Sequence, residues 1–247
     1  MMRWQCTLFQ QVWPAVVVLA SVALGLAMQA DPLLGQDEER IPSVAAGTPA
    51  VLFPVQAARP TAGGAWPGGA LNENDVLETL EAEFEFAFGE EDDAVSWVLP
   101  DAAVRRLRSN PTIDVDPYRV AYHGLLRKPK KEEQIYEPLH TQLRHVAALF
   151  DARIVVLPLL VWYERAEELD EEGELADDEE KEEAEQEDNP DASKEPQGRG
   201  VMLVAVIDIR RSTVLWHGEI RGELAPVSSS KLLTTLALAV ADQLVPS

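Results

Sequence analysis

The sequence RIVVLPLLVWY (residues 153–163) is an apolar run rich in β-branched side chains, which predicts a buried strand. A second run of this kind, VMLVAVIDI (201–209), follows after a long and very acidic interval. The polar turn RRS (210–212) joins it to TVLWHGEIR (213–221), so these residues predict a hairpin. The chain then closes with a helix, because apolar side chains recur at helical spacing at Leu232, Leu233, Leu236, Val240 and Leu244.

Further elements precede this carboxy-terminal core. The sequence AVLFPVQ (50–56) predicts the opening strand, and its proline favours an edge position or a strand end. Asn74 can cap a helix that continues to about residue 88. The alternation of Phe84, Phe86 and Phe88 also suits a strand, so the pattern leaves the end of this helix open.

The middle of the chain predicts a strand, two helices and one unassigned stretch. The strand covers residues 94–99, and a helix begins at residue 100 or 101 and ends near Asn110. A longer helix runs from near Pro138 to Phe150. Residues 114–131 show no clear periodicity beyond a short helix at 118–126.

The first thirty residues have the layout of a secretory signal peptide. Arg3 gives a weakly positive start, residues 16–26 are apolar, and the small residues Ala27 and Ala30 offer cleavage sites. The alternative is an uncleaved membrane anchor at residues 12–28, although this run is short for a span and contains Pro14. We expect a periplasmic or secreted protein, or in the alternative an N-terminally anchored one, with residues 31–49 as a flexible tether.

Charge is concentrated in one interval. The chain carries a formal net charge of −22, and residues 164–195 hold 18 acidic and three basic residues, which leaves −7 for the rest. We expect residues 165–199 to be a disordered acidic insert in an otherwise ordinary domain. Nucleic-acid binding is not expected, because it requires clustered Lys and Arg.

No linear pattern identifies a catalytic, cofactor-binding or metal-binding residue. The only cysteine, Cys6, would leave with the signal peptide. His140 and His145 are five residues apart and do not share a helix face, so a zinc site of the HExxH kind is not expected. Asp208 ends a strand and is interpreted as a turn former rather than an acid or base.

Two tryptophans are candidate partner contacts. Trp162 and Trp216 both lie in apolar predicted strands, and each combines a large apolar ring with one polar group. Packing into the core is the simpler interpretation of both side chains. An exposed strand edge is the other surface that could bind a partner.

The order of elements resembles a known family. The segment VIDIRRSTVLWHGEIRGE (206–223) places Asp208, Val214, Leu215, Trp216 and Gly218 as in the small α/β module of bacterial envelope proteins, of which the TolB amino-terminal domain, CsgG and LpoB are examples. The turn departs from the family pattern, since Ser212-Thr213 stands where a Thr-Gly-like pair is usual. The acidic insert also replaces a shorter connection.

These observations predict one α/β domain (α+β-like) over residues 50–247. We expect a mixed sheet of about five strands and three to four helices packed mainly on one face. The resemblance implies a non-catalytic envelope protein that contacts other envelope proteins or a second copy of itself, without membrane span after cleavage. The alternatives are an exported hydrolase whose site no linear motif reveals, and a cation-binding acidic surface protein.

Overall fold

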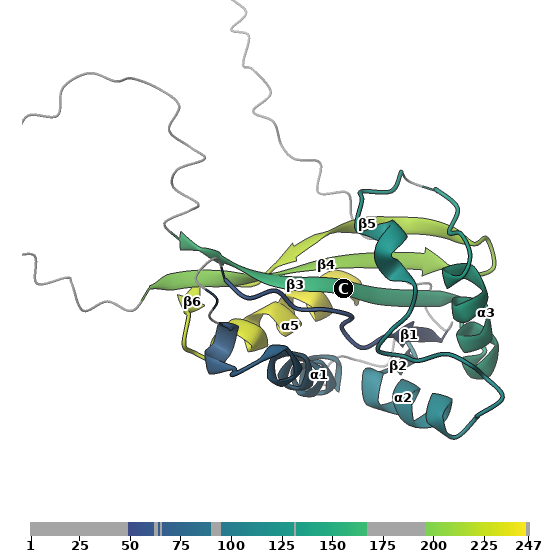
Figure 1. Ribbon diagram of the computed structural model, residues 1–247, viewed down its shortest axis with the longest axis horizontal. Coiled ribbons are helices and arrows are strands. Elements are labelled where there is room, and N and C mark those ends of the chain that lie inside the picture. The colour runs from purple at the N-terminus through teal and green to yellow at the C-terminus, as the bar shows by residue number, and fades with distance from the viewer. Residues whose placement is uncertain are drawn as a thin grey trace, which may run out of the picture. The chain divides into compact units, whose positions relative to one another are not determined.

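The computed structural model describes residues 49–61, 64, 66–89, 95–130, 132–166 and 196–245 (Figure 1). All of them belong to the compact unit that spans Arg40–Ser247. The expected signal peptide, nearly all of the expected tether and most of the acidic insert lie outside the described residues.

A six-stranded mixed sheet organises the described residues. Its order is β2 (Trp97–Val98), β1 (Ala50–Leu52), β3 (Ile154–Arg165), β4 (Gln197–Asp208) and β5 (Thr213–Arg221), and β6 (Ala225–Pro226) pairs with β4. The pairs of β1 with β2 and β3 are parallel, whereas those of β3 with β4 and of β4 with β5 are antiparallel. The expected mixed sheet and its carboxy-terminal hairpin are therefore confirmed.

One face of the sheet is covered by two long helices. The apolar sides of α1 (Glu73–Gly89) and α5 (Lys231–Leu244) pack on alternate residues of β1, β3 and β4 (Figure 1). Continuous apolar strands suit this arrangement, because the opposite face of the sheet is also covered over part of its length.

A second apolar cluster lies on the other face. It joins α2 (Pro100–Arg108), α3 (Leu139–Phe150) and the segment 113–135 to the remaining side chains of β3, β4 and β5. Figure 1 shows α3 at the end of the sheet where β3 begins. The sequence left residues 114–131 unassigned apart from a short helix at 118–126, and the described residues of this stretch form the short 3-10 helix η2 (Tyr122–Leu125) there.

Two local expectations were wrong in detail, and one alternative that the sequence left open is now decided. The opening strand ends at Leu52, because Pro54 has no N–H to donate, and the chain then continues beside β3 through separate hydrogen bonds. The helix α1 is capped by Asn72, whose Oδ1 accepts the N–H of Asp75 at 3.2 Å, and not by Asn74. The same helix continues to Gly89 and leaves Phe86 53% exposed, so the strand alternative there is excluded.

The long β3–β4 hairpin reaches into the range expected for the acidic insert. β3 continues to Arg165 and β4 begins at Gln197, so only residues 167–195 of that range lie outside the described part. A bulge between Pro158 and Leu160 accommodates the central proline. Each helix among the described residues is too short or too polar to traverse a lipid bilayer.

Candidate functional site

The turn between β4 and β5 is fixed by a buried carboxylate. The side chain of Asp208 has no exposed surface, and its Oδ2 accepts hydrogen bonds from Nε and Nη2 of Arg153 at 2.9 and 2.7 Å. Its Oδ1 accepts the backbone N–H of Arg211 at 3.1 Å. The interpretation of Asp208 as a turn former is confirmed, and this turn positions Ser212.

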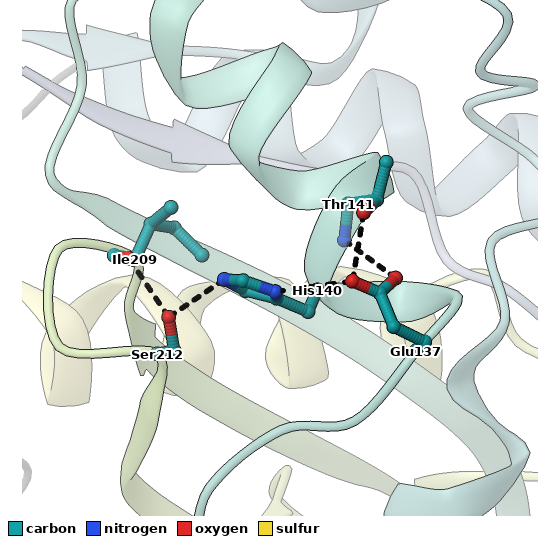
Figure 2. Close-up of polar contacts among 5 residues, drawn as sticks. All are labelled: Glu137, His140, Thr141, Ile209 and Ser212. Carbon is teal, nitrogen blue, oxygen red and sulfur yellow. Dashed lines mark hydrogen bonds and ion pairs between the residues drawn. The ribbon is translucent and has the colours of Figure 1, made fainter.

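Ser212 lies at the end of a hydrogen-bonded chain of three side chains. Its Oγ is 2.8 Å from Nε2 of His140, and Nδ1 of the same imidazole is 3.3 Å from Oε1 of Glu137 (Figure 2). With the ring proton on Nδ1, the imidazole donates to the carboxylate and Nε2 can accept the hydroxyl proton, for which the carbonyl of Ile209, at 3.4 Å, is a second and longer acceptor (Figure 2). This is the connectivity of a serine, histidine and acid triad.

The carboxylate of Glu137 is held at the start of α3. It accepts the hydroxyl of Thr141 at 2.8 Å and the backbone N–H of Thr141 at 3.2 Å (Figure 2). These bonds, with a smaller contribution from His140, hold the pKa of Glu137 below its usual range, although partial desolvation acts in the opposite direction. Glu137 is therefore ionised at neutral pH and can orient the imidazole.

Backbone pairing brings these distant residues together. The segment before α3 runs antiparallel to the start of β5, and the N–H of Ile135 donates to the carbonyl of Ser212 at 2.9 Å. The N–H of Glu132 and the carbonyl of Glu133 bond Val214 in the same way. His140 lies in the first turn of α3, shortly after this paired segment, and its side chain faces Ser212 (Figure 2).

A separate pocket of about 390 Å³ lies at the other end of the second face. Its apolar lining includes Leu126, Leu160, Trp162 and Leu203, and its charged lining is Arg59 and Glu219. The strand register explains this grouping, because Leu160 is opposite Leu203 and Leu203 is opposite Glu219. Trp162 is half-buried, so part of its ring is available at the surface.

Charged side chains of β3, β4 and β5 lie beside this pocket. Glu164 accepts the Nη2 of Arg199 at 3.0 Å and lies 3.7 Å from Nε of Arg221, which also pairs with Glu219. Half-exposed ion pairs of this kind add little to stability. They do supply a polar border next to an apolar pocket.

The two predicted contact residues are not brought together. Trp162 packs on the α3 side of the sheet, whereas Trp216 packs against the core beneath α1 and α5. The Trp216 ring also lies over Gly218, where an added Cβ would come within 2.6 Å of it. Core packing thus accounts for Trp216, and only Trp162 lines the pocket.

His217, on β5, lies apart from this chain of side chains. Its Nε2 is 2.7 Å from the carbonyl of Leu125, and burial lowers its pKa, so the neutral ring is favoured. In the described ranges, no three His, Cys, Asp or Glu side chains gather as a metal site requires.

The Ser212, His140 and Glu137 chain was not found from the sequence. Glu137 and His140 were placed in one helical turn, and Ser212 in a hairpin turn, but 72 residues separate His140 from Ser212. The i, i+3 spacing of Glu137 and His140 was the one local signal, and it is common on helices that have no active site.

Comparison with known proteins gives structural similarities alone. No family model matches the chain, and a search of curated proteins finds no match. Among solved structures, the chain is similar to the LpoB C-terminal domain from Salmonella enterica, with 12% identity over 74% of this chain and 85% of that chain and a TM-score of 0.34. It is also similar to the hypothetical protein CT253 from Chlamydia trachomatis, with 13% identity over 79% and 89% and a TM-score of 0.32. LpoB is one of the examples of the envelope module that the sequence resembles.

Proposed function

We propose that the protein is an interaction module of the bacterial cell envelope, which binds a partner protein through the pocket at Trp162. The pocket is the observation that carries this proposal. It combines a half-buried tryptophan with the side chains of Leu160 and Leu203 and has charged groups of both signs beside it. An apolar centre with a polar rim is the usual anatomy of a protein interface, and tryptophan is enriched among its strongest contacts.

The lining defines the chemistry of the partner. Leu126, Leu160 and Leu203 favour one large aliphatic or aromatic side chain, and the volume is sufficient for it. Arg59 can donate hydrogen bonds to a carbonyl, and Glu219 can accept them from an N–H, of the backbone that carries this anchor. Another envelope protein or a second copy of this chain can supply such a side chain.

Binding rather than catalysis is the function that this pocket supports. The residues that line this pocket include neither a histidine nor a cysteine. Its charged groups are Arg59, from the loop after β1, and Glu219, from β5. The alternative of a cation-binding acidic surface concerns the insert, whose residues 167–195 lie outside the described part.

Site-specific crosslinking in native cells tests this proposal. A photo-crosslinking amino acid at Leu126, which lines the pocket and is 36% exposed, should give one discrete adduct. The same amino acid at Leu238, exposed on α5, is the matched control and should not give it. The adduct should weaken at least fivefold with Trp162→Ala and with Glu219→Lys, a surface change that spares the fold.

Two outcomes would contradict the binding proposal. An adduct of equal strength from Leu238 would mean that the contact is not made at the pocket. An adduct that persists in both the Trp162 and Glu219 variants would mean that the pocket does not hold the partner. Adduct mass distinguishes a second copy of the chain from a different protein.

The proposed envelope location rests on the first thirty residues of the sequence. Export through a cleaved signal peptide should place the mature protein in the periplasm or medium, beginning at residue 28 or residue 31. Amino-terminal sequencing of the fractionated protein checks this. A protein that retains residues 1–30 in the membrane fraction would favour the anchored alternative, and one found in the cytoplasm would refute export.

A further inference from the structure

We propose that Ser212 is a nucleophile activated by His140 and oriented through Glu137, and that the site hydrolyses activated carboxylic esters slowly. This activity goes beyond the proposed binding function and uses a different part of the molecule. Residue 154 of β3 pairs with Asp208 next to this turn, whereas Trp162 lies eight residues further along the strand, which corresponds to roughly 25 Å.

The contacts assign a role to each atom. The Oγ of Ser212 meets Nε2 of His140 at 2.8 Å, which is within the range for a nucleophile and its general base. The other ring nitrogen meets Oε1 of Glu137 at 3.3 Å, and this carboxylate is fixed by two bonds from Thr141 (Figure 2). Thr141 lies in the first turn of α3, so the same carboxylate that anchors the start of the helix also faces the imidazole.

The backbone presents the serine in an unusual conformation. Ser212 has a φ of 57°, in the left-handed region that residues with a Cβ rarely adopt. The bond from Ile135 to its carbonyl and the bond from its N–H to the carbonyl of Ile209, at 3.3 Å, hold it there. Strained backbone positions of this kind cluster at functional sites.

The site is accessible to small molecules. The His140 side chain is 25% exposed and that of Glu137 is 63% exposed, while Ser212 is half-buried. A small ester can therefore approach the Oγ of Ser212 from solvent.

The reaction needs no co-reactant other than water. The Oγ of Ser212 bonds to the ester carbonyl carbon while its proton passes to Nε2 of His140. The bond to the alcohol oxygen then breaks, and Nε2 returns the proton to that oxygen. Water attacks the acyl-serine, its proton passes through Nε2 to the departing Oγ, and the sum is ester plus water to acid plus alcohol.

The bonded amides of the turn limit the substrate class. The N–H groups of Ile209, Arg211 and Ser212 already donate to Arg153, Asp208 and Ile209, so these three cannot stabilise an oxyanion without rearrangement. Loss of one such donor costs about 10²–10³ in rate in established hydrolases. We therefore assign to this site esters with good leaving groups, such as aryl esters.

Active-site labelling tests the proposal on the full chain. A fluorophosphonate probe should form one adduct, located on the peptide that contains Ser212, and p-nitrophenyl acetate should be hydrolysed above the background rate. Ser212→Ala should abolish both signals. Ser230→Ala is the matched control, because Ser230 is an exposed serine outside the site, and it should leave both unchanged.

The role of His140 requires a readout that a structural contact would not move. His140→Ala should slow labelling at least tenfold, and added imidazole should restore part of the rate. Glu137→Gln should lower the turnover of p-nitrophenyl acetate at an unchanged melting temperature, as expected of a positioning residue. Absence of an adduct on Ser212 in folded protein, or equal labelling in the His140 variant, would overturn the assignment.

Discussion

Replacement of Asp208 by asparagine should lower the free energy of unfolding by about 2–3 kcal/mol at pH 7. The carboxylate is fully buried and accepts two hydrogen bonds from Arg153 and one from the backbone of Arg211. Asparagine keeps the shape but loses the charge and turns an N–H₂ group toward existing donors. The loss stays below the about 3–5 kcal/mol typical of a broken buried pair, because the Arg153 side chain is 38% exposed and can regain water.

The effect should depend on pH with a defined sign. Burial raises the pKa of Asp208, but the bonds from Arg153 and from the N–H of Arg211 lower it by more than burial raises it. The pKa in the folded protein therefore lies below its ordinary value. The unfolded value is about 3.9. The carboxylate therefore stabilises the fold fully above that value, and this contribution is lost as the pH falls through the lower folded pKa.

Urea unfolding followed by circular dichroism measures this difference. The difference in free energy of unfolding between the wild type and Asp208→Asn should be constant from pH 7 to about pH 5 and should shrink below about pH 4. The control is Asp101→Asn, since Asp101 pairs with Arg105 at the surface and should change stability by no more than about 0.5 kcal/mol. A gap below about 1 kcal/mol at pH 7, or one that does not narrow in acid, would refute the reasoning.

Two further pairs of variants test the packing. Phe84→Ala should cost about 3–5 kcal/mol of unfolding free energy, because the ring is fully buried, while Phe86→Ala on the exposed side of α1 should stay within about 0.5 kcal/mol. Gly222→Ala should cost about 1–3 kcal/mol, because its Cβ would lie 2.9 Å from the backbone nitrogen of Leu236 in α5. A Cβ added at Gly124 would meet open space, so Gly124→Ala should leave the free energy of unfolding nearly unchanged. Thermal melting measures all four, and equal shifts within either pair would contradict the packing described here.

Much of the sheet was predictable because its strands are long apolar runs. β3 and β4 bury side chains on both faces over most of their length, so their prediction as strands did not depend on weak periodicity. β5 is mostly half-buried and was predicted from the hairpin turn that precedes it. The closing helix α5 was equally clear from its apolar spacing. The resemblance to the envelope module rested on these same elements.

There is a physical reason why most of the segment 113–135 was not predicted from the sequence. It buries single side chains such as Val120, Leu125 and Ile135 against the sheet without a repeating period. Its polar groups are satisfied by distant partners, such as Gln56, whose Oε1 accepts the N–H of Val120 at 3.2 Å. The local sequence does not indicate which distant residues these partners are.

The sequence by itself determined the mixed sheet, its hairpin and the separation of charge into one acidic interval, because burial of continuous apolar runs depends on composition and spacing. Only the tertiary structure decided that Trp162 and Trp216 lie on opposite faces, because a bulge in β3 shifts the alternation of its side chains. Only the tertiary structure placed His140 against Ser212 as well. That contact depends on the pairing of the segment before α3 with the start of β5, and pairing between distant segments follows from the packing of the whole domain.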